Sequence, residues 1–162
     1  HPNAVVLHLG CGLDSRCQRV DWSGANAEWY DLDLPDVIDL RRKFFPETAA
    51  YHLIASPADS LGWVEQVNAQ GRRVFVAAEG LLMYLCEADV RALFLRLRER
   101  FPGCELACDV FSRLTARRVA AHPSLQKTGA AVQWGIDDPR EIEAWAGRFA
   151  PRVLERGDVL EL

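Results

Sequence analysis

The chain has 162 residues, of which 49% are hydrophobic and 26% charged, a composition typical of one globular domain and not of a disordered or fibrous protein. Lysine and arginine total 19 against 23 aspartate and glutamate, so the net charge is −4 and a nucleic-acid partner is not expected. No apolar run approaches the length of a membrane span, so no membrane partner is expected either. The five cysteines form no CxxC pair, which predicts neither disulfides nor a metal site and favours a cytoplasmic location.

Short apolar runs alternate with longer amphipathic stretches, and this alternation predicts βα units in a parallel sheet. The predicted strands are 4–9, 28–33, 51–55, 73–78, 105–110 and 152–162. The predicted helices are 36–45, 63–67, 87–101, a polar stretch ending at 121, and a last one from a capping box at 138–141 to 146. The continuous apolar run of 73–78 indicates the central strand, buried on both faces.

One α/β domain over 1–162 is therefore expected, with a mostly parallel sheet and helices on both faces. Residues 111–137 interrupt the alternation and are interpreted as an insertion on the substrate side. The chain opens directly on a strand and closes on one without a hairpin partner, so we expect a sheet that is incomplete at both ends, in a piece of a longer protein.

Two glycines, Gly10 and Gly12, follow the first predicted strand. Glycines at this place allow a sharp turn and the close approach of a ligand to the backbone. A dinucleotide-binding GxGxxG pattern would need glycine at Ser15, so the sequence favours a mononucleoside ligand. The alternative is a plain tight turn between strand and helix.

Two acidic residues, Asp31 and Asp33, end the second predicted strand about 20 residues beyond the glycines. In doubly wound sheets a carboxylate at this place accepts the hydroxyls of a ribose. Strand alternation puts both on one face, and we assign the ribose to Asp33, the last before Pro35, with Asp31 as a solvated neighbour. The alternative is helix N-capping by Asp33 or Asp36.

Glu79 follows the apolar strand 73–78 directly. A carboxylate there needs a cationic or hydrogen-bonding partner, and the α-ammonium group of a ligand would serve. A salt bridge to an arginine is the alternative that we rank lower, because ligands bind at the carboxyl ends of strands. Gly80 is placed in the same binding site, and the apolar residues 81–85 would wall it, with Tyr84 as its polar tip.

Other polar residues carry weaker signals. Asp59 and Ser60 follow the third strand and could meet an adenine edge, although such a pair is also ordinary turn chemistry. His8 lies inside a strand and is expected to be a core histidine with its hydrogen bonds satisfied. Among the histidines only His122, beside a proline in the insertion, could face a substrate.

Two arginines, Arg16 and Arg19, lie one helical turn apart after the glycines. At this spacing we expect them to pair with Asp14 or Asp21 rather than to contact a ligand.

Five segments in this order and spacing resemble the leucine carboxyl methyltransferase family: VVLHLGCGLDSR, WYDLDLP, YHLIAS, VFVAAEGLLMYL and RFPGCEL. The resemblance is strongest to the bacterial polyketide O-methyltransferase branch of that family. It implies a Rossmann-like class I methyltransferase that uses S-adenosyl-L-methionine. Relatives also carry an amino-terminal helical segment, with an arginine for the cofactor carboxylate, and a closing strand pair, neither of which this chain shows in full.

The resemblance also implies a role for each residue of the binding site. The roles are as follows: Gly10 and Gly12 border the methionine moiety, Asp33 holds the ribose, Asp59 and Ser60 lie by the adenine, and Glu79 receives the amino group.

The implied function is methyl transfer to a hydroxyl or carboxyl oxygen of a small molecule such as a polyketide, by in-line displacement and without a metal. A carboxylate acceptor would need no base, whereas a phenol would, and Tyr84 and His122 are the candidates. The alternative is a non-catalytic module that binds S-adenosyl-L-methionine or a partner. A nicotinamide-dependent dehydrogenase ranks third because the third glycine is lacking.

Overall fold

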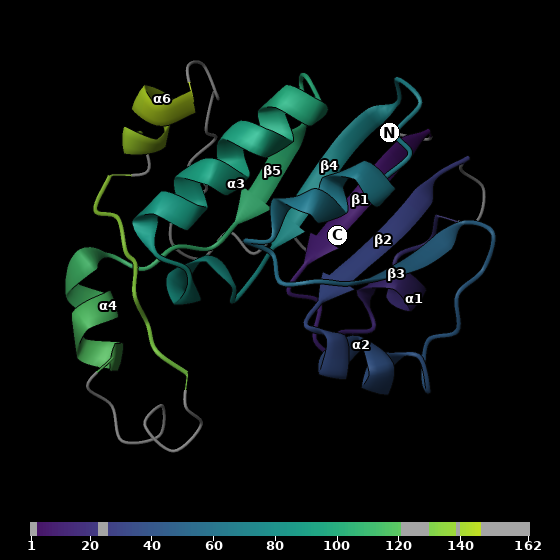
Figure 1. The fold of residues 1–162 in the computed structure, drawn as a ribbon, viewed down its shortest axis with the longest axis horizontal. Helices are drawn as coiled ribbons and strands as arrows, with labels where there is room; N and C mark the ends of the chain where they lie inside the picture. The colour runs from purple at the N-terminus through teal and green to yellow at the C-terminus, as the bar shows by residue number, and fades with distance from the viewer. Residues whose placement is uncertain (1–2, 23–25, 121–129, 139, 147–162) are drawn as a thin grey trace.

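The structure, a computed structural model, describes residues 3–22, 26–120, 130–138 and 140–146. Within these ranges five parallel strands form one sheet in the order β3-β2-β1-β4-β5 (Figure 1). The strands are β1 (Ala4–Leu9), β2 (Glu28–Asp33), β3 (Tyr51–Ala55), β4 (Arg73–Ala78) and β5 (Glu105–Cys108). The parallel sheet and four of the predicted strand ranges are confirmed, and β5 ends two residues before the predicted boundary. The predicted strand 152–162 lies outside the described residues.

Within the described sheet β1 is the middle strand, and β4, the predicted central strand, lies next to it with a neighbour on each side; the further strand predicted at 152–162, which would decide the centre of the whole sheet, lies outside the described residues. β4 lies between β1 and β5, and its residue Phe75 remains partly exposed. An apolar run predicts that a strand is flanked by neighbours, but it does not encode how many strands lie beyond each neighbour.

Helices connect the strands. They are α1 (Arg16–Arg19), α2 (Pro35–Arg41), α3 (Glu87–Arg100), α4 (Arg113–Ala120) and α6 (Glu141–Ala146), with the 3-10 helices η1 (Leu61–Gln66) and η2 (Leu82–Tyr84). α2 ends at Arg41 instead of the predicted residue 45, because residues 42–45 continue as turns. None of the helices in the described ranges is long and apolar enough to cross a lipid bilayer.

The larger core lies between the sheet and α3. The predicted helical stripe is confirmed, because Val90, Leu93, Phe94 and Leu97 of α3 are all buried. Burial of each such side chain contributes about 1.5–3 kcal/mol to folding. The same core receives Val5, Leu7 and Leu9 from β1 and Val74, Val76 and Ala78 from β4.

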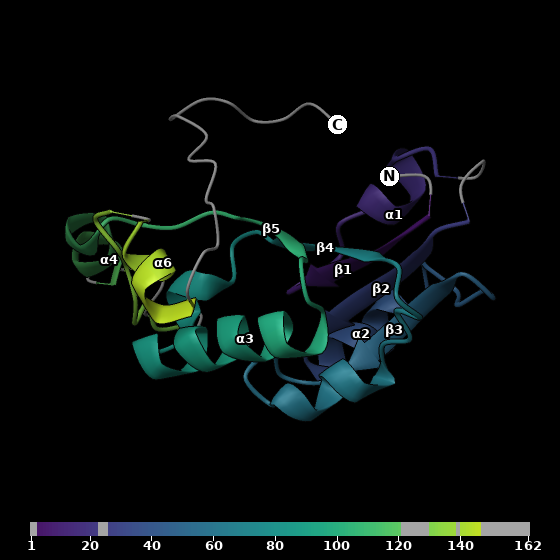
Figure 2. The same ribbon diagram turned by 90° about the horizontal axis from the view of Figure 1, so that it is seen from above.

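A smaller core covers the opposite face of the sheet. It joins Cys17 of α1 and Ile38 of α2 to Trp29, Tyr51 and Leu53 of the strands. Figure 2 shows α1 and α3 on opposite sides of the sheet. Helices therefore cover both faces, and this smaller core underlies β1, β2 and β3.

Within the region predicted as an insertion, residues 130–136 pack onto the larger core. Trp134 and Ile136 are buried there, and the amides of Gln133 and Trp134 donate to the carbonyl of Met83, at 2.8 and 3.2 Å. The amide of Ile136 donates to the carbonyl of Phe111 at 2.8 Å. The segment 130–136 therefore lies against η2, in the loop region that follows β4.

Candidate functional site

Three neighbouring strands bring the predicted site residues together at the edge of the sheet that is formed by the carboxyl ends of the strands. β2, β1 and β4 are adjacent and parallel, with Leu9 beside Leu32 on one side and beside Ala78 on the other. The carboxyl ends of these strands carry Asp33, the glycine turn 10–12 and Glu79 (Figure 1). The two carboxylates thus flank the turn, and the chain order reverses between β1 and β4, where ligands of open α/β sheets bind.

The two glycines of the turn share a backbone conformation but differ in the space around them. Gly10 and Gly12 have φ values of +66° and +50°, in the left-handed region that other residues rarely adopt. A Cβ atom on Gly10 would lie 3.2 Å from the Cβ atom of Leu81, whereas one on Gly12 would meet nothing within 4 Å. Gly10 therefore packs against the loop after β4, while the space beside Gly12 is open.

Asp33 keeps hydrogen-bonding capacity at the edge of the sheet. Its Oδ2 atom accepts the amide of Gly12 at 2.7 Å and its Oδ1 atom accepts the amide of Leu34 at 2.8 Å. Each ionised carboxylate oxygen can accept a further hydrogen bond. The N-cap residue of α2 is Leu34, so the alternative in which Asp33 or Asp36 caps this helix is not what the structure shows.

Asp31 is buried, so the expectation that it is a solvated neighbour is wrong. Its Oδ1 atom accepts from Trp29 Nε1 at 2.7 Å and lies 3.2 Å from His8 Nδ1. Its Oδ2 atom accepts from the hydroxyl of Tyr51 at 2.5 Å and from Arg41 Nε at 2.9 Å. The core role predicted for His8 is confirmed, since the ring is buried and has a partner.

The partner of Asp31, Arg41, also reaches the glycine turn. Both side chains have no exposed surface, and Arg41 Nη1 donates to the carbonyl of Gly12 at 3.0 Å. Burial by itself would raise the pKa of Asp31, but the hydrogen bonds from His8 and Tyr51 and the charge of Arg41 outweigh it. The pKa of Asp31 therefore lies below its ordinary value, and the carboxylate stays ionised.

Glu79 has an arginine as its partner, which is the alternative ranked lower from the sequence. Its side chain is 67% exposed, and Arg16 Nη2 donates to Oε2 at 2.6 Å. β4 ends at Ala78, so Glu79 starts the loop and leaves the buried surface. A strand pattern does not encode on which residue the chain emerges from the core.

The predicted pairing of the two arginines with Asp14 is confirmed. Arg16 Nη2 lies 3.4 Å and Arg19 Nη2 3.3 Å from an oxygen of Asp14, whose Oδ1 atom also accepts the amide of Arg16 at 2.5 Å. Burial raises the pKa of Asp14, but this amide and the positive charge of Arg16 lower it further, so the net shift is downward.

One residue of this edge, Asp109, was missed in the sequence. It follows β5, and its Oδ1 atom accepts the amide of Gly80, which has a φ of +65°, at 2.8 Å. The signal that could have found it is the one used for Asp33 and Glu79, an acidic residue directly after a strand.

The remaining predicted residues lie farther out or outside the described ranges. Asp59 and Ser60 are exposed in the turn between β3 and η1, where the carbonyl of Asp59 accepts the amide of Leu61 at 3.0 Å. Tyr84 is an exposed residue of η2. His122 lies outside the described residues.

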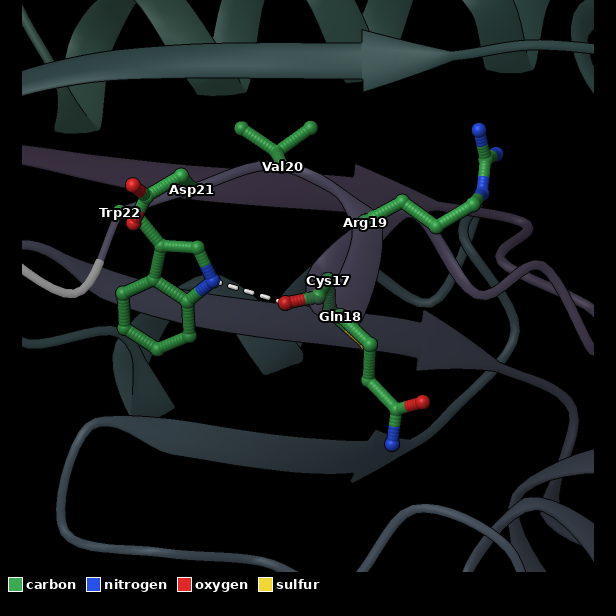
Figure 3. Close-up of a pocket in the computed structure, with 6 residues that line it drawn as sticks. All are labelled: Cys17, Gln18, Arg19, Val20, Asp21 and Trp22. Atoms are coloured by element: carbon green, nitrogen blue, oxygen red, sulfur yellow. Dashed lines mark hydrogen bonds between the residues drawn. The ribbon is translucent and has the colours of Figure 1, made fainter.

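A surface hollow beside α1 is separate from the predicted site residues. It is lined by the continuous segment Cys17, Gln18, Arg19, Val20, Asp21 and Trp22 (Figure 3). Trp22 Nε1 donates to the carbonyl of Cys17 at 2.7 Å, as the dashed line in Figure 3 marks. Within the described ranges, no group of three or more histidine, cysteine or acidic side chains is arranged to hold a metal ion.

The strand order and the helices on both faces define a Rossmann-like α/β domain. Solved methyltransferases share this fold at low sequence identity. A SAM-dependent methyltransferase from Anabaena variabilis superposes with a TM-score of 0.62 at 11% identity, over 90% of this chain and 63% of that one. Human N-acetylserotonin methyltransferase gives a TM-score of 0.57 at 11% identity, over 88% and 40% of the two chains.

Residues 3–98 match the model of the leucine carboxyl methyltransferase family, and the chain belongs to that family. It is 40% identical to the tetracenomycin polyketide synthesis O-methyltransferase TcmP of Streptomyces glaucescens over 144 residues, 89% of this chain and 53% of TcmP. It is 34% identical to the S-adenosyl-L-methionine-dependent methyltransferase dpfgK of Gibberella zeae, over 86% of this chain and 51% of that protein. The chain thus spans about half the length of these curated relatives.

Proposed function

We propose that this chain carries the S-adenosyl-L-methionine-binding part of an O-methyltransferase whose acceptor is a hydroxyl or carboxyl oxygen of a small molecule such as a polyketide. The observation that carries the proposal is the convergence of Asp33 and Glu79 on the two sides of the glycine turn, at the ends of adjacent strands. The family and the similarity to TcmP, an O-methyltransferase, support this reaction, and the similarity to dpfgK, an S-adenosyl-L-methionine-dependent methyltransferase, supports the cofactor.

The chemistry of the edge suits such a cofactor. Asp33 has one acceptor site left on each carboxylate oxygen, which is what two ribose hydroxyls require. Gly10 and Gly12 would border the methionine part, where the absence of side chains leaves the backbone accessible. Asp59 and Ser60, one strand farther out than Asp33, would lie beside the adenine.

The carboxylate of Glu79, with Gly80 beside it, would receive the α-ammonium group. Its exposure and its bond to a single arginine leave Oε1 available as an acceptor. The chemistry that the cofactor supplies when bound is a methyl group activated by a positively charged sulfur. The residues of the chain would hold this group and an acceptor oxygen in line, and such positioning supplies a large part of the rate enhancement in bimolecular transfers.

A phenolic acceptor would also need a base, and we propose Tyr84 or His122 for this role. Tyr84 is five residues beyond Glu79 and its side chain is exposed, so an acceptor could reach its hydroxyl. All five cysteines are free thiols, which supports a reducing compartment such as the cytoplasm.

Calorimetric titration with S-adenosylhomocysteine tests the ribose assignment. Asp33→Asn removes the charge that strengthens hydrogen bonds to the ribose, and such bonds are worth about 1.5–3 kcal/mol, so we expect affinity to fall by about tenfold or more. The matched control is Asp36→Asn, an exposed acid three residues along in α2, which should bind as the wild type does. Equal affinities of the wild type and Asp33→Asn would refute the assignment.

Methyl transfer to a panel of small phenols and carboxylic acids tests the reaction itself. Turnover with any of these acceptors supports the transferase. Cofactor binding without turnover across the panel would favour the non-catalytic module instead.

A further inference from the structure

We propose that Gln133 is a positioning residue for the acceptor side of the site, because it holds the 3-10 helix η2 from outside and so fixes the place of Tyr84. This inference rests on the proposed function, in which Tyr84 faces the acceptor, and adds to it a residue of the segment 130–136. It concerns the acceptor and leaves the binding of the cofactor unchanged.

The 3-10 helix η2 has little support from its own backbone. Its turns are closed by the amide of Tyr84, which donates to the carbonyl of Leu81 at 3.0 Å, and by the amide of Leu85, which donates to that of Leu82 at 3.1 Å. Short 3-10 helices have poor hydrogen-bond geometry, and the last carbonyls of a helix have no partner inside it. The buried side chains of Leu82 and Met83 fix one side of η2, but Tyr84 is exposed. The orientation of Tyr84 therefore depends on groups outside η2.

Gln133 supplies two of these groups. Its backbone amide donates to the carbonyl of Met83 at 2.8 Å, and its side-chain Nε2 atom donates to the carbonyl of Tyr84 at 2.7 Å. One residue from a distant part of the chain thus binds two consecutive carbonyls at the end of η2. Gln133 is itself exposed, so its side-chain bond lies at the surface and not in the core.

The backbone that carries Gln133 is fixed in place. The next residue, Trp134, is buried in the larger core, and so is Ile136. Between them, a Cβ atom on Gly135 would lie 2.9 Å from the carbonyl oxygen of Phe111, so only glycine permits this close approach to the start of α4. Gln133 therefore reaches η2 from a rigid support.

The other end of the loop after β4 is held separately. The amide of Gly80 donates to Oδ1 of Asp109 at 2.8 Å, where β5 ends. Loss of the Gln133 side-chain bond should consequently free the end of the loop that carries Tyr84 and leave the end that carries Glu79 in place. The inference thus predicts an effect on the acceptor without an effect on the cofactor.

Hydrogen–deuterium exchange of the whole chain tests the contact itself. Gln133→Met keeps the length of the side chain and removes its donor, so the amides of Tyr84 and Leu85 should exchange about fivefold faster. Gln133→Lys keeps a donor and should restore exchange close to that of the wild type. The matched control is Gln66→Met, at an exposed glutamine of η1, which should leave both amides unchanged.

Methyl transfer to a phenol tests the role at the acceptor. For Gln133→Met we expect the rate at saturating cofactor to fall by about fivefold or more, because the hydroxyl of Tyr84 leaves its position. Affinity for S-adenosylhomocysteine, measured by calorimetry, should stay within about twofold. In a Tyr84→Phe background the same substitution should lower the rate no further, since Gln133 acts through that hydroxyl.

Four results would overturn the inference. If the amides of Tyr84 and Leu85 exchange in Gln133→Met as they do in the wild type, the bond does not hold η2. If this variant loses affinity for S-adenosylhomocysteine as much as it loses rate, the residue acts on the cofactor edge or on the fold. If it slows transfer equally with and without the hydroxyl of Tyr84, it acts by another route.

The fourth result separates the inference from the proposed function. A wild type that binds S-adenosylhomocysteine and methylates carboxylic acids but no phenol would overturn the role of Gln133 and leave the transferase standing. A wild type that binds no S-adenosylhomocysteine would refute the proposed function, and the inference with it.

Discussion

Asp31 and Asp33 lie two residues apart on β2, point to the same face of the sheet and have opposite environments. Asp31 is fully buried, and its two oxygens are surrounded by four side chains, from β1, β2, β3 and α2. Asp33 lies at the end of the strand, is only half-buried and accepts two backbone amides. Both side chains lie on the same face of the sheet, so the face does not decide their roles. The comparison teaches that the position along the strand does: a carboxylate inside the strand stabilises the fold, whereas one at the end of the strand can still bind a ligand.

The largest expected effect comes from breaking the buried pair. Arg41→Met leaves the ionised Asp31 without its cation in a fully buried place, which should lower the free energy of unfolding by about 3–5 kcal/mol. The measurement is urea denaturation at neutral pH. The control is Arg42→Met, the next residue, whose ion pairs are exposed, and which should cost less than about 1 kcal/mol. Similar losses in the two variants would show that the buried network does not stabilise the fold.

A smaller effect, with a defined pH dependence, is expected for Tyr51→Phe. Its hydroxyl donates to the ionised form of Asp31, so its removal should cost about 1.5–3 kcal/mol at pH 7. The pKa of Asp31 is lowered in the folded state from an ordinary value of 3.8, so its stabilising contribution is complete above about pH 4 and is lost as pH falls further.

The difference in unfolding free energy between the wild type and Tyr51→Phe should therefore stay constant above about pH 4 and shrink as the pH falls below that value. Tyr30→Phe is the comparison, because Tyr30 donates to the partly exposed Glu28 and should cost less at pH 7. A cost of Tyr51→Phe that stays constant over this pH range would contradict the ionised state assigned to Asp31.

Substitution of Gly10 or Gly12 should lower the free energy of unfolding by an intermediate amount. Alanine at either position must adopt a left-handed backbone, at a cost of about 1–2 kcal/mol. Gly10→Ala should cost more than Gly12→Ala, because only its Cβ atom would press on Leu81. Urea denaturation of the two variants measures this difference, and an equal or reversed order would show that the contact with Leu81 relaxes freely.

The smallest effect on stability is expected for Asp33→Asn. The side-chain oxygen of asparagine can keep one of the two amide bonds, so unfolding free energy should fall by about 1 kcal/mol or less. The same denaturation assay measures it. A loss as large as that of Arg41→Met would place Asp33 with the structural residues and remove the distinction from Asp31.

Most of the sheet could be predicted because each strand is a short segment whose apolar residues stand out from the polar residues around it, although β2 (EWYDLD) also contains acidic residues. The ranges of β1, β2, β3 and β4 follow from this contrast alone, and the helical stripe of α3 follows from its 3.6-residue period. The order of the strands was harder, since the pattern of β4 is the pattern of any strand with two neighbours.

The hydrogen-bond and ion-pair partners of charged residues could not be predicted from local sequence pattern. Arg41 falls on the inner side of α2 among apolar residues, and nothing in its spacing shows that its guanidinium lies beneath the glycine turn. Likewise, Arg16 and Glu79 are 63 residues apart, and only the adjacency of β1 and β4 brings them together. Pairings of this kind depend on tertiary structure, whereas strands and helices depend on local pattern.

Gly12 joins the two regions through one residue. Its amide donates to Asp33 at the rim, and its carbonyl accepts from Arg41 in the interior. A variant that loosens the interior should consequently alter affinity without touching the surface where a ligand lies, through a displacement of this single residue. Selection for tight binding would then extend to amino acids that no ligand ever contacts.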